Sequence, residues 1–251
     1  MMTQPSQLMK PDLVMVHGLF ASGAASALDD VGRARGGAVA EYGEALGVCH
    51  YEWVSGHERK LANRFLRRAR GTARPVDAVE IMELNETIVR ASLKDQSARI
   101  QWRKMLGCEL YGLDVDRSFI LVGKPRQLLE GPAKGQRLLW FGRGLSQLSE
   151  AEFVAHYTGH HGPLVASYAR PLGLRKYRQV PNEEAAICNA LRELGLGGGI
   201  PTPVFAELVM GAPPLALASL RTRKTASREI EADEKRHIDF PHSMLLLVKG
   251  S

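Results

Sequence analysis

Four side chains that can carry a proton lie close together between residues 156 and 161, where the sequence reads HYTGHH. Histidine exchanges a proton near neutral pH, so a histidine beside a cavity is a candidate general acid or base. Gly159 and Gly162 flank His160 and His161, and Pro163 follows, which predicts a break or kink in the helix at the imidazoles. We expect His161 to turn its ring into a cavity as the catalytic group and His160 to point elsewhere. The alternative is a histidine at the exposed end of a helix.

The helix that carries these rings is predicted to begin after Ser149, a typical N-cap residue that is followed by acidic residues. Phe153, His156 and Tyr157 recur at the i, i+3, i+4 spacing that places side chains on one helix face. His156 and Tyr157 therefore lie one turn before His161. Both could line the same pocket as substrate-binding residues.

A strand is predicted at Leu174–Val180, where Tyr177 and Gln179 share one face of the alternating pattern. A tyrosine at this place could donate a hydrogen bond to a carbonyl or phenolate, or relay a proton with His161. We therefore take Tyr177 as catalytic and Gln179 as substrate-binding. The alternative is a core tyrosine whose hydroxyl is already hydrogen-bonded.

Three more polar residues fall near predicted strands. Glu207 interrupts the otherwise apolar VFAELVM, so its carboxylate must find a partner or raise its pKa. We consider Glu207 a catalytic candidate, and either Glu207 or His156 would orient the imidazole of His161. The alternative for Glu207 is a paired structural role. His237 and Asp239 precede the last strand and could close the rim of a pocket, unless they are simply exposed polar positions.

The segment that contains these residues resembles the EthD family of small ferredoxin-like domains over roughly residues 136–251. At one position near the end, His237 stands where the family usually has an aromatic residue. The resemblance implies domains that pair as dimeric α/β barrels and chemistry without a cofactor on aromatic, polyketide-like or lactone substrates. Haem, which some related barrels use, is the less favoured alternative. The motifs that carry the resemblance, in the family's order, are Tyr157, His161, Pro163, Leu164, Gly173, Tyr177 and Gln179, then Asp233-Glu234 and Ile238-Asp239.

The chain also repeats itself, because residues recur at a constant offset of 126 positions (168 − 42 = 126). Tyr42 falls on Tyr168 and Tyr51 falls on Tyr177. Such self-similarity indicates a duplicated unit, and the predicted order β-α-β-(α)-β-α-β is close to a ferredoxin-like unit. Strands are expected at 13–16, 48–54, 76–84 and 118–122 in the first copy, and at 138–141, 174–180, 204–210 and 244–248 in the second.

We therefore predict an α+β fold of two tandem ferredoxin-like units that form an intrachain dimeric α/β barrel. A disordered tail is expected at 1–10, the first unit at 11–123, a linker at 124–136 and the second unit at 137–251. Each antiparallel sheet would carry helices on one face and leave the other free to pack against the second sheet.

The first copy is diverged at the positions that matter for chemistry. Arg35 stands at the position of His161, and Trp53 at the position of Gln179. Arg35 could hold an anionic group of a substrate, and Tyr51 could line a pocket as Tyr177 does.

The chain carries a formal net charge of +6, much of it in the segment His57–Arg74, which reads as an amphipathic helix. A solvated helix face explains such a run best, and a positive rim that attracts an anionic substrate is the second interpretation. Nucleic-acid binding is not favoured, because neither an aromatic platform nor a binding motif accompanies the charge.

Other features exclude several classes of protein. No apolar run reaches transmembrane length and no secretory signal is visible, so a cytoplasmic protein is expected, without membrane partners. Cys49, Cys108 and Cys188 lack metal-ligand spacing and read as free thiols. His17-Gly18 resembles the oxyanion loop of α/β-hydrolases, but the chain contains no G-x-S-x-G nucleophile motif. Neither a Walker motif nor G-x-G-x-x-G is present.

Two classes of function remain. The first is a lyase or isomerase without cofactor or metal, acting by acid–base catalysis on a small hydrophobic, aromatic or anionic molecule in a catabolic or secondary pathway. The second is a non-catalytic accessory protein that binds a hydrophobic intermediate of an oxidative degradation system. An oxygenase without cofactor is a lesser alternative, and a homodimer is compatible with either class.

Overall fold

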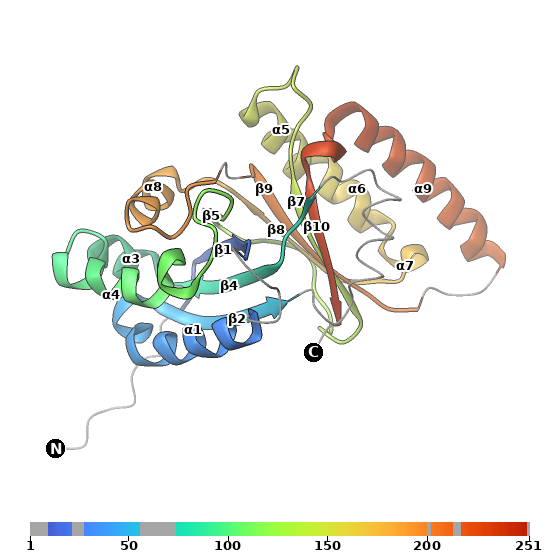
Figure 1. Ribbon diagram of the computed structural model, residues 1–251. Coiled ribbons are helices and arrows are strands. Elements are labelled where there is room, and N and C mark those ends of the chain that lie inside the picture. Colours follow the sequence, from blue (N-terminus) through green and yellow to red (C-terminus); the bar gives the residue numbers. More distant parts are fainter. Residues whose placement is uncertain (1–9, 22–27, 56–73, 200–201, 213–216, 250–251) are drawn as a thin grey trace. The chain divides into compact units, whose positions relative to one another are not determined.

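The computed structural model describes residues 10–21, 28–55, 74–199, 202–212 and 217–249 (Figure 1). The chain divides into two compact units. Unit 1 comprises Met1–Val54, Asp77–Lys124 and Glu183–Ile200, and unit 2 comprises Ser55–Val76, Pro125–Asn182 and Pro201–Ser251. Most of the basic segment expected at His57–Arg74 lies outside the described residues, as does most of the expected N-terminal tail.

Unit 1 is built on an antiparallel sheet with the strand order β2-β4-β1-β5. Its core joins the apolar face of this sheet to the helices, with Trp102, Met105 and Leu106 of α4 fully buried. The strands are β1 (Leu13–Leu19), β2 (Val48–Ser55), β4 (Ala78–Leu84) and β5 (Phe119–Gly123), and the helices are α1 (Leu28–Tyr42), α3 (Glu86–Ser92), α4 (Gln96–Leu106) and α8 (Ala185–Glu193), with short 3-10 turns at Glu44–Leu46 and Cys108–Tyr111.

The helical segment after β4 consists of two helices, each with its own N-cap. The side chain of Asn85 accepts a hydrogen bond from the backbone N–H of Ile88 and caps α3. A second cap interrupts the segment, because the carboxylate of Asp95 accepts the N–H of Ala98 and starts α4. Side chains of this kind favour helix starts over helix interiors, which explains the break.

Unit 2 holds a larger sheet with the order β3-β10-β7-β9-β8-β6. The expected linker 124–136 contains a strand, since β6 pairs with β8 at the sheet edge. The strands are β3 (Arg74–Pro75), β6 (Arg126–Leu129), β7 (Gln136–Gly142), β8 (Leu174–Pro181), β9 (Val204–Met210) and β10 (Met244–Lys249), and the helices are α5 (Glu150–His156), α6 (Gly162–Ser167), α7 (Ala169–Leu172) and α9 (Leu217–His237), with a π-helical segment at Tyr157–His161 and a 3-10 turn at Phe240–His242.

The same topology recurs in the two sheets, so the ferredoxin-like prediction is confirmed. Numbered within each copy, both read 4-1-3-2: β5-β1-β4-β2 in unit 1 and β10-β7-β9-β8 in unit 2. Residues 48–55 of β2 lie 126 positions before residues 174–181 of β8, and residues 78–84 of β4 lie 126 positions before residues 204–210 of β9. Gly47 and Gly173 precede the second strand of each copy, and both adopt the left-handed backbone conformation.

The two faces of the unit 2 sheet differ in what covers them. Trp140, Tyr177, Ala206 and Leu245 belong to an apolar cluster with side chains of the helices, so they mark the helix face. Along β9, alternate residues point to opposite faces. Glu207 therefore points away from the helices, on the face of Phe205.

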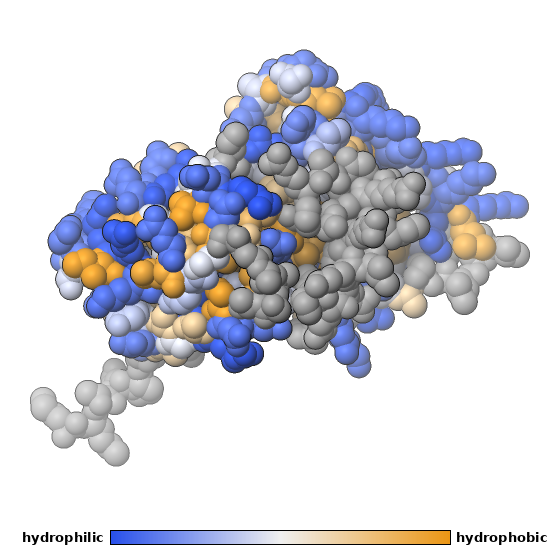
Figure 2. Space-filling model, viewed as in Figure 1, coloured by the Kyte–Doolittle hydropathy of each residue, from blue (hydrophilic) through white to orange (hydrophobic). Residues whose placement is uncertain are grey.

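Helix α9 buries only a narrow stripe of side chains, and most of its other described residues are polar and exposed. Ala226 and Asp233 are buried and Ile230 is half-buried, whereas most other described side chains of the helix are exposed. Figure 2 shows hydrophilic residues along the visible side of this helix. None of the described helices is long and apolar enough to cross a membrane. All three cysteines are free, as expected.

Candidate active site in unit 2

The first helix of the site starts where the sequence predicts. Ser149 caps α5 with a reciprocal capping box, in which the Ser149 hydroxyl accepts the N–H of Glu152 and the Glu152 carboxylate accepts the N–H of Ser149. The helix then continues through a π-helical turn at Tyr157–His161 into α6. Of the predicted break or kink at the glycines, the break is therefore wrong, and the helix has a π turn there instead. Such π turns are frequent at functional sites, since they change the direction of the side chains that follow.

The π turn brings His161 to Asp233 of α9. Nδ1 of His161 lies 2.9 Å from Oδ2 of Asp233, and both side chains are buried. A carboxylate accepts hydrogen bonds, so His161 carries its proton on Nδ1, and Nε2 is left as the basic nitrogen. Within the described part of the chain, Nε2 has no hydrogen-bond partner. Asp233 therefore orients the ring and fixes the tautomer that a general base requires.

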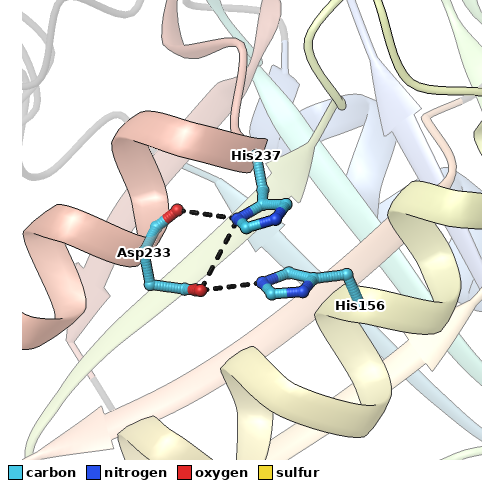
Figure 3. A group of neighbouring side chains, drawn as sticks. All are labelled: His156, Asp233 and His237. Atoms are coloured by element: carbon cyan, nitrogen blue, oxygen red, sulfur yellow. Dashed lines mark hydrogen bonds and ion pairs between the residues drawn. The ribbon is translucent and has the colours of Figure 1, made fainter.

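Asp233 also gathers the other histidines of this region (Figure 3). Its Oδ1 lies 2.8 Å from Nε2 of His156 and 3.5 Å from Nδ1 of His237. The imidazoles of His156 and His237 stack with ring centroids 3.4 Å apart. His160 lies farther out, with Nε2 at 3.7 Å from the same oxygen and a side chain 63% exposed.

Burial and hydrogen bonding act in opposite directions on this group. Burial lowers the pKa of His161 by more than its bond to Asp233 raises it, so the ring is held in its neutral form. Burial also lowers the pKa of His156. For Asp233, burial alone would raise the pKa of the carboxyl, but the hydrogen bonds from His161 and His156 outweigh it and lower the pKa. The aspartate is thus held as the anion.

Two tyrosines and a glutamine complete the buried side of the site. The Tyr157 ring stacks on His161 with centroids 4.8 Å apart. The Tyr177 hydroxyl accepts a hydrogen bond of 2.7 Å from Nε2 of Gln179, which also donates to the backbone carbonyl of Tyr157 at 3.2 Å. Burial raises the pKa of both phenols, so both keep their protons. Because the Tyr177 hydroxyl is the acceptor in its bond with Gln179, its own O–H proton is left to be donated.

Trp140, Ala206 and Gln179 lie side by side on three neighbouring strands. Two polar atoms of this row have no hydrogen-bond partner in the described structure. Ala206 pairs with Trp140 on one side and with Gln179 on the other, all on the helix face. Oε1 of Gln179 and Nε1 of Trp140 are buried without a hydrogen-bond partner in the described structure. Buried polar atoms are rarely left unpaired, so this acceptor and this donor on either side of a small residue mark a place where a ligand can bind.

Gly162 packs closely against the side chain of Gln179, so a larger residue there would force Gln179 to shift. A Cβ at Gly162 would lie 2.7 Å from Nε2 and 2.8 Å from Oε1 of Gln179, which is closer than real side chains approach. The glycine predicted to break the helix thus serves close packing of the helix against the sheet.

The structure does not bring every predicted residue to this site. Glu207 lies on the other face of the sheet, where Arg137 at 2.6 Å and Arg178 at 2.8 Å pair with it. Burial alone would raise the pKa of Glu207, but Arg178, Arg137 and Lys176 outweigh it and lower the pKa. The expectation that Glu207 orients His161 is therefore wrong, since Asp233 holds that position.

Asp239 is engaged in a turn. Its carboxylate accepts the backbone N–H of His242 at 3.3 Å and lies 2.8 Å from Nδ1 of the same residue. His237, the other predicted rim residue, joins the cluster around Asp233 instead.

Arg35 and Tyr51 belong to a buried network in unit 1. Arg35 is fully buried and forms an ion pair with Glu80, and the Tyr51 hydroxyl donates to the same carboxylate at 3.0 Å. His17, on the neighbouring strand, lies 3.0 Å from Glu80 through Nδ1. The expectation that Arg35 meets an anionic substrate fails, because its guanidinium is already paired with Glu80 away from solvent.

The two copies also differ at the strand position that this network uses. Glu80 of β4 and Ala206 of β9 occupy equivalent positions at the offset of 126. In unit 1 Glu80 forms an ion pair with Arg35, whereas the equivalent residues of unit 2 are Ala206 and His161. That only the second copy keeps a working histidine stays a prediction.

Asp233 belongs to the motif Asp233-Glu234 that carries the family resemblance, but the sequence analysis gives it no role in the site. One signal was available: Asp233 lies on the inward stripe of α9, three residues after Ile230 and seven after Ala226. A carboxylate on an apolar stripe needs a buried partner. The histidines of the π turn are the partners.

The residues of this site lie within a segment that matches a known protein family. Residues 145–241 match the EthD domain. The resemblance predicted from the sequence is confirmed for these residues. The EthD match contains the whole of α5, α6, α7, β8, β9 and α9, and with them His161, Tyr177, Gln179 and Asp233.

Other comparisons give weaker likenesses. No curated protein matches the chain. Among solved structures, a protein from Lactobacillus acidophilus NCFM described as a "putative monooxygenase" shares 8% identity at a TM-score of 0.46, with 95% of this chain and 93% of that chain covered. A protein of the same description from Fusobacterium nucleatum subsp. nucleatum ATCC 25586 also shares 8% identity at a TM-score of 0.46, with 96% and 92% covered. Likenesses this remote carry no argument about activity.

Proposed function

We propose that unit 2 is an enzyme that transfers protons on a small hydrophobic or aromatic molecule, as a lyase or isomerase does. The observation that carries the proposal is the hydrogen bond between Nδ1 of His161 and Asp233, which leaves Nε2 free to accept a proton. A histidine with one nitrogen held by a carboxylate is the usual general base of proteins.

The chemistry divides between two groups. Nε2 of His161 takes a proton from the substrate, and Asp233 stabilises the imidazolium that forms. The O–H of Tyr177 donates to the substrate oxygen on which negative charge develops, while Gln179 holds the phenol in place. His161 then returns the proton to another atom of the substrate, which completes an isomerisation, or to a leaving group, which completes an elimination.

The substrate class follows from the surroundings of the site. Trp140, Phe153 and Tyr157 supply apolar surface on the helix face of the sheet. The unpartnered Oε1 of Gln179 would accept one donor of the ligand, and Nε1 of Trp140 would donate to one acceptor. A flat molecule with a hydroxyl and a carbonyl, as in phenolic and polyketide-like compounds, fits this pattern.

A substrate panel tests the proposal. Purified protein is incubated with phenols, aromatic acids, lactones and polyketide-like ketones, and conversion is followed by mass spectrometry. We expect turnover of at least one class and a loss of about 100-fold or more in His161→Ala. His242→Ala, which removes an exposed histidine that is also paired with an aspartate, serves as the control.

Three outcomes contradict the proposal. Equal turnover in His161→Ala removes the assigned base. Binding of a ligand without conversion indicates the accessory role. Consumption of oxygen during turnover indicates an oxygenase.

A further inference from the structure

Three side chains of the site take no part in the proposed proton transfer. His156 and His160 lie four residues apart in the segment from α5 into the π turn, and His237 lies four residues after Asp233 on α9. Spacing of this kind places both members of a pair on one side of a helix. Two such pairs on packed helices are a common way to build a metal site inside a helical layer.

The ligand atoms converge on one carboxylate oxygen. Oδ1 of Asp233 lies 2.8 Å from Nε2 of His156 and 3.5 Å from Nδ1 of His237 (Figure 3). The two nitrogens and a carboxylate oxygen of Asp233 all lie within 4.8 Å of one another. Metal–nitrogen and metal–oxygen bonds of about 2.0–2.2 Å place neighbouring ligands about 3–3.5 Å apart. The observed separations from Oδ1 are already close to this range.

The geometry also leaves an approach for an ion. Figure 3 shows both nitrogens at the edge of the stacked rings that faces Asp233. The side chains of His156 and His237 are 21% and 24% exposed, so the site is not sealed. His160 stands at the outside, with Nε2 at 3.7 Å from Oδ1, where it could add a fourth ligand.

The other oxygen of Asp233 is held in place independently. His161 binds Oδ2 at 2.9 Å, so the carboxylate is oriented before any ion arrives. Metal-ligating carboxylates are usually hydrogen-bonded in this way by a second group, which improves affinity.

We propose that His156, Asp233 and His237 bind a divalent first-row transition metal ion, with His160 or water in the remaining position. Two imidazoles and one carboxylate suit zinc, iron, nickel or cobalt, whereas magnesium and calcium prefer oxygen ligands alone. On binding, the ion takes the place of the contact between His156 and Asp233, and of the hydrogen bond of 3.0 Å from His237 to the backbone carbonyl of Asp233. The proposal does not depend on the catalytic role of His161, because binding is measured without turnover.

Zinc titration tests the site. Full-length protein without an affinity tag is treated with a chelator, dialysed, and titrated with Zn²⁺ in a calorimeter. We expect one strong site per chain with a Kd of about 1 μM or tighter. His156→Ala and His237→Ala should each weaken binding by at least about 10-fold. Both side chains are partly exposed, so we expect both variants to fold, and circular dichroism checks this.

The matched control is His242→Ala, since His242 lies 2.8 Å from an aspartate on the surface of the same unit. The site is supported if the control binds zinc as tightly as the wild type and His237→Ala binds it much more weakly. Absence of saturable binding in the wild type, or equal affinity in all the variants, overturns it. Asp233→Asn adds a test that keeps the shape of the side chain and should also lose the strong site.

The readouts separate this inference from the proposed function. His161→Ala leaves both candidate nitrogens and Asp233 in place, so a zinc site should persist there, at an affinity lowered by up to about 100-fold through loss of the supporting hydrogen bond. A chain that binds zinc but converts no substrate refutes only the catalytic proposal. A chain that converts substrate but does not bind zinc refutes only the metal site.

Discussion

Nδ1 of His161 lies 2.9 Å from Oδ2 of Asp233, although the two residues are 72 positions apart in the sequence. The π turn between α5 and α6 carries the histidine, and the inward stripe of α9 carries the aspartate. This contact fixes the tautomer of the ring and leaves Nε2 as the basic nitrogen.

The first prediction concerns the orientation of the ring. Asp233→Asn replaces an anionic acceptor by an amide that cannot stabilise an imidazolium, so we expect turnover to fall by about 100-fold or more. Turnover is measured on the substrate found in the panel, with His242→Ala as the control. Unchanged turnover in Asp233→Asn would show that the aspartate does not support the base.

The second prediction concerns Tyr177. If its O–H donates to a developing oxyanion, Tyr177→Phe should lower kcat by about 100-fold with little change in KM. Tyr157→Phe should have a smaller effect, because a phenylalanine ring keeps the stacking of Tyr157 on His161. Equal effects of the two substitutions would indicate that the phenols only pack the core.

The third prediction concerns the small residue between Trp140 and Gln179. In Ala206→Leu the larger side chain fills the space between Trp140 and Gln179, so ligand binding should weaken by at least about 10-fold. The free energy of unfolding should fall by about 1–3 kcal/mol, because the core is overpacked. Ala78→Leu introduces the same side chain at a fully buried position of β4 in unit 1 and is the control. Ligand affinity is measured by calorimetry and stability by denaturant unfolding. A wild-type affinity in Ala206→Leu would place the ligand elsewhere.

The fourth prediction separates structure from catalysis in unit 1. Glu80→Gln removes the carboxylate that Arg35, Tyr51 and His17 share, and leaves a buried guanidinium without a counter-charge. We expect a loss of about 3–5 kcal/mol in the free energy of unfolding. At a temperature where the variant is still folded, kcat should equal that of the wild type. A large fall in kcat under those conditions would assign a catalytic role to this network.

The fifth prediction concerns pH and stability. The folded-state pKa of Glu207 is lowered by Arg178, Arg137 and Lys176, against the effect of burial. The stabilisation is therefore complete above the unfolded-state pKa, about 4.3 for glutamate, and is lost as the pH falls through the lower folded-state pKa. Denaturant unfolding between neutral and acidic pH should show a steeper acid loss in the wild type than in Glu207→Gln. Parallel curves for the two proteins would contradict this account.

Local signals made much of the fold predictable from the sequence. Ser149 and Asn85 are caps because their side chains accept backbone N–H groups, and this preference is visible in four or five residues of sequence. The strands of the second copy follow from apolar runs, and the bounds Val204–Met210 agree with those predicted. The repeat at 126 positions predicted that the strands of the two sheets are equivalent.

Contacts between distant segments were not predictable in the same way. Strand β6 lies in a stretch rich in proline, glycine and charge, and it forms only because β8 offers it an edge. Gly159 and Gly162 read as helix breakers, but packing against Gln179 keeps the chain helical through a π turn. The partners of Glu207 and His161 depend on which strand or helix lies beside them, and such pairings leave little trace in either segment alone.

The central claim, that Nε2 of His161 moves a proton on the substrate, is tested most directly by isotope exchange. The compound that the panel identifies as a substrate is incubated in D₂O with wild-type protein and, separately, with His161→Ala. Mass spectrometry then measures deuterium in the remaining substrate and in the product. We predict that the wild type introduces solvent deuterium at a carbon position and that His161→Ala does not. Deuterium incorporation at the wild-type rate in the variant would contradict the claim.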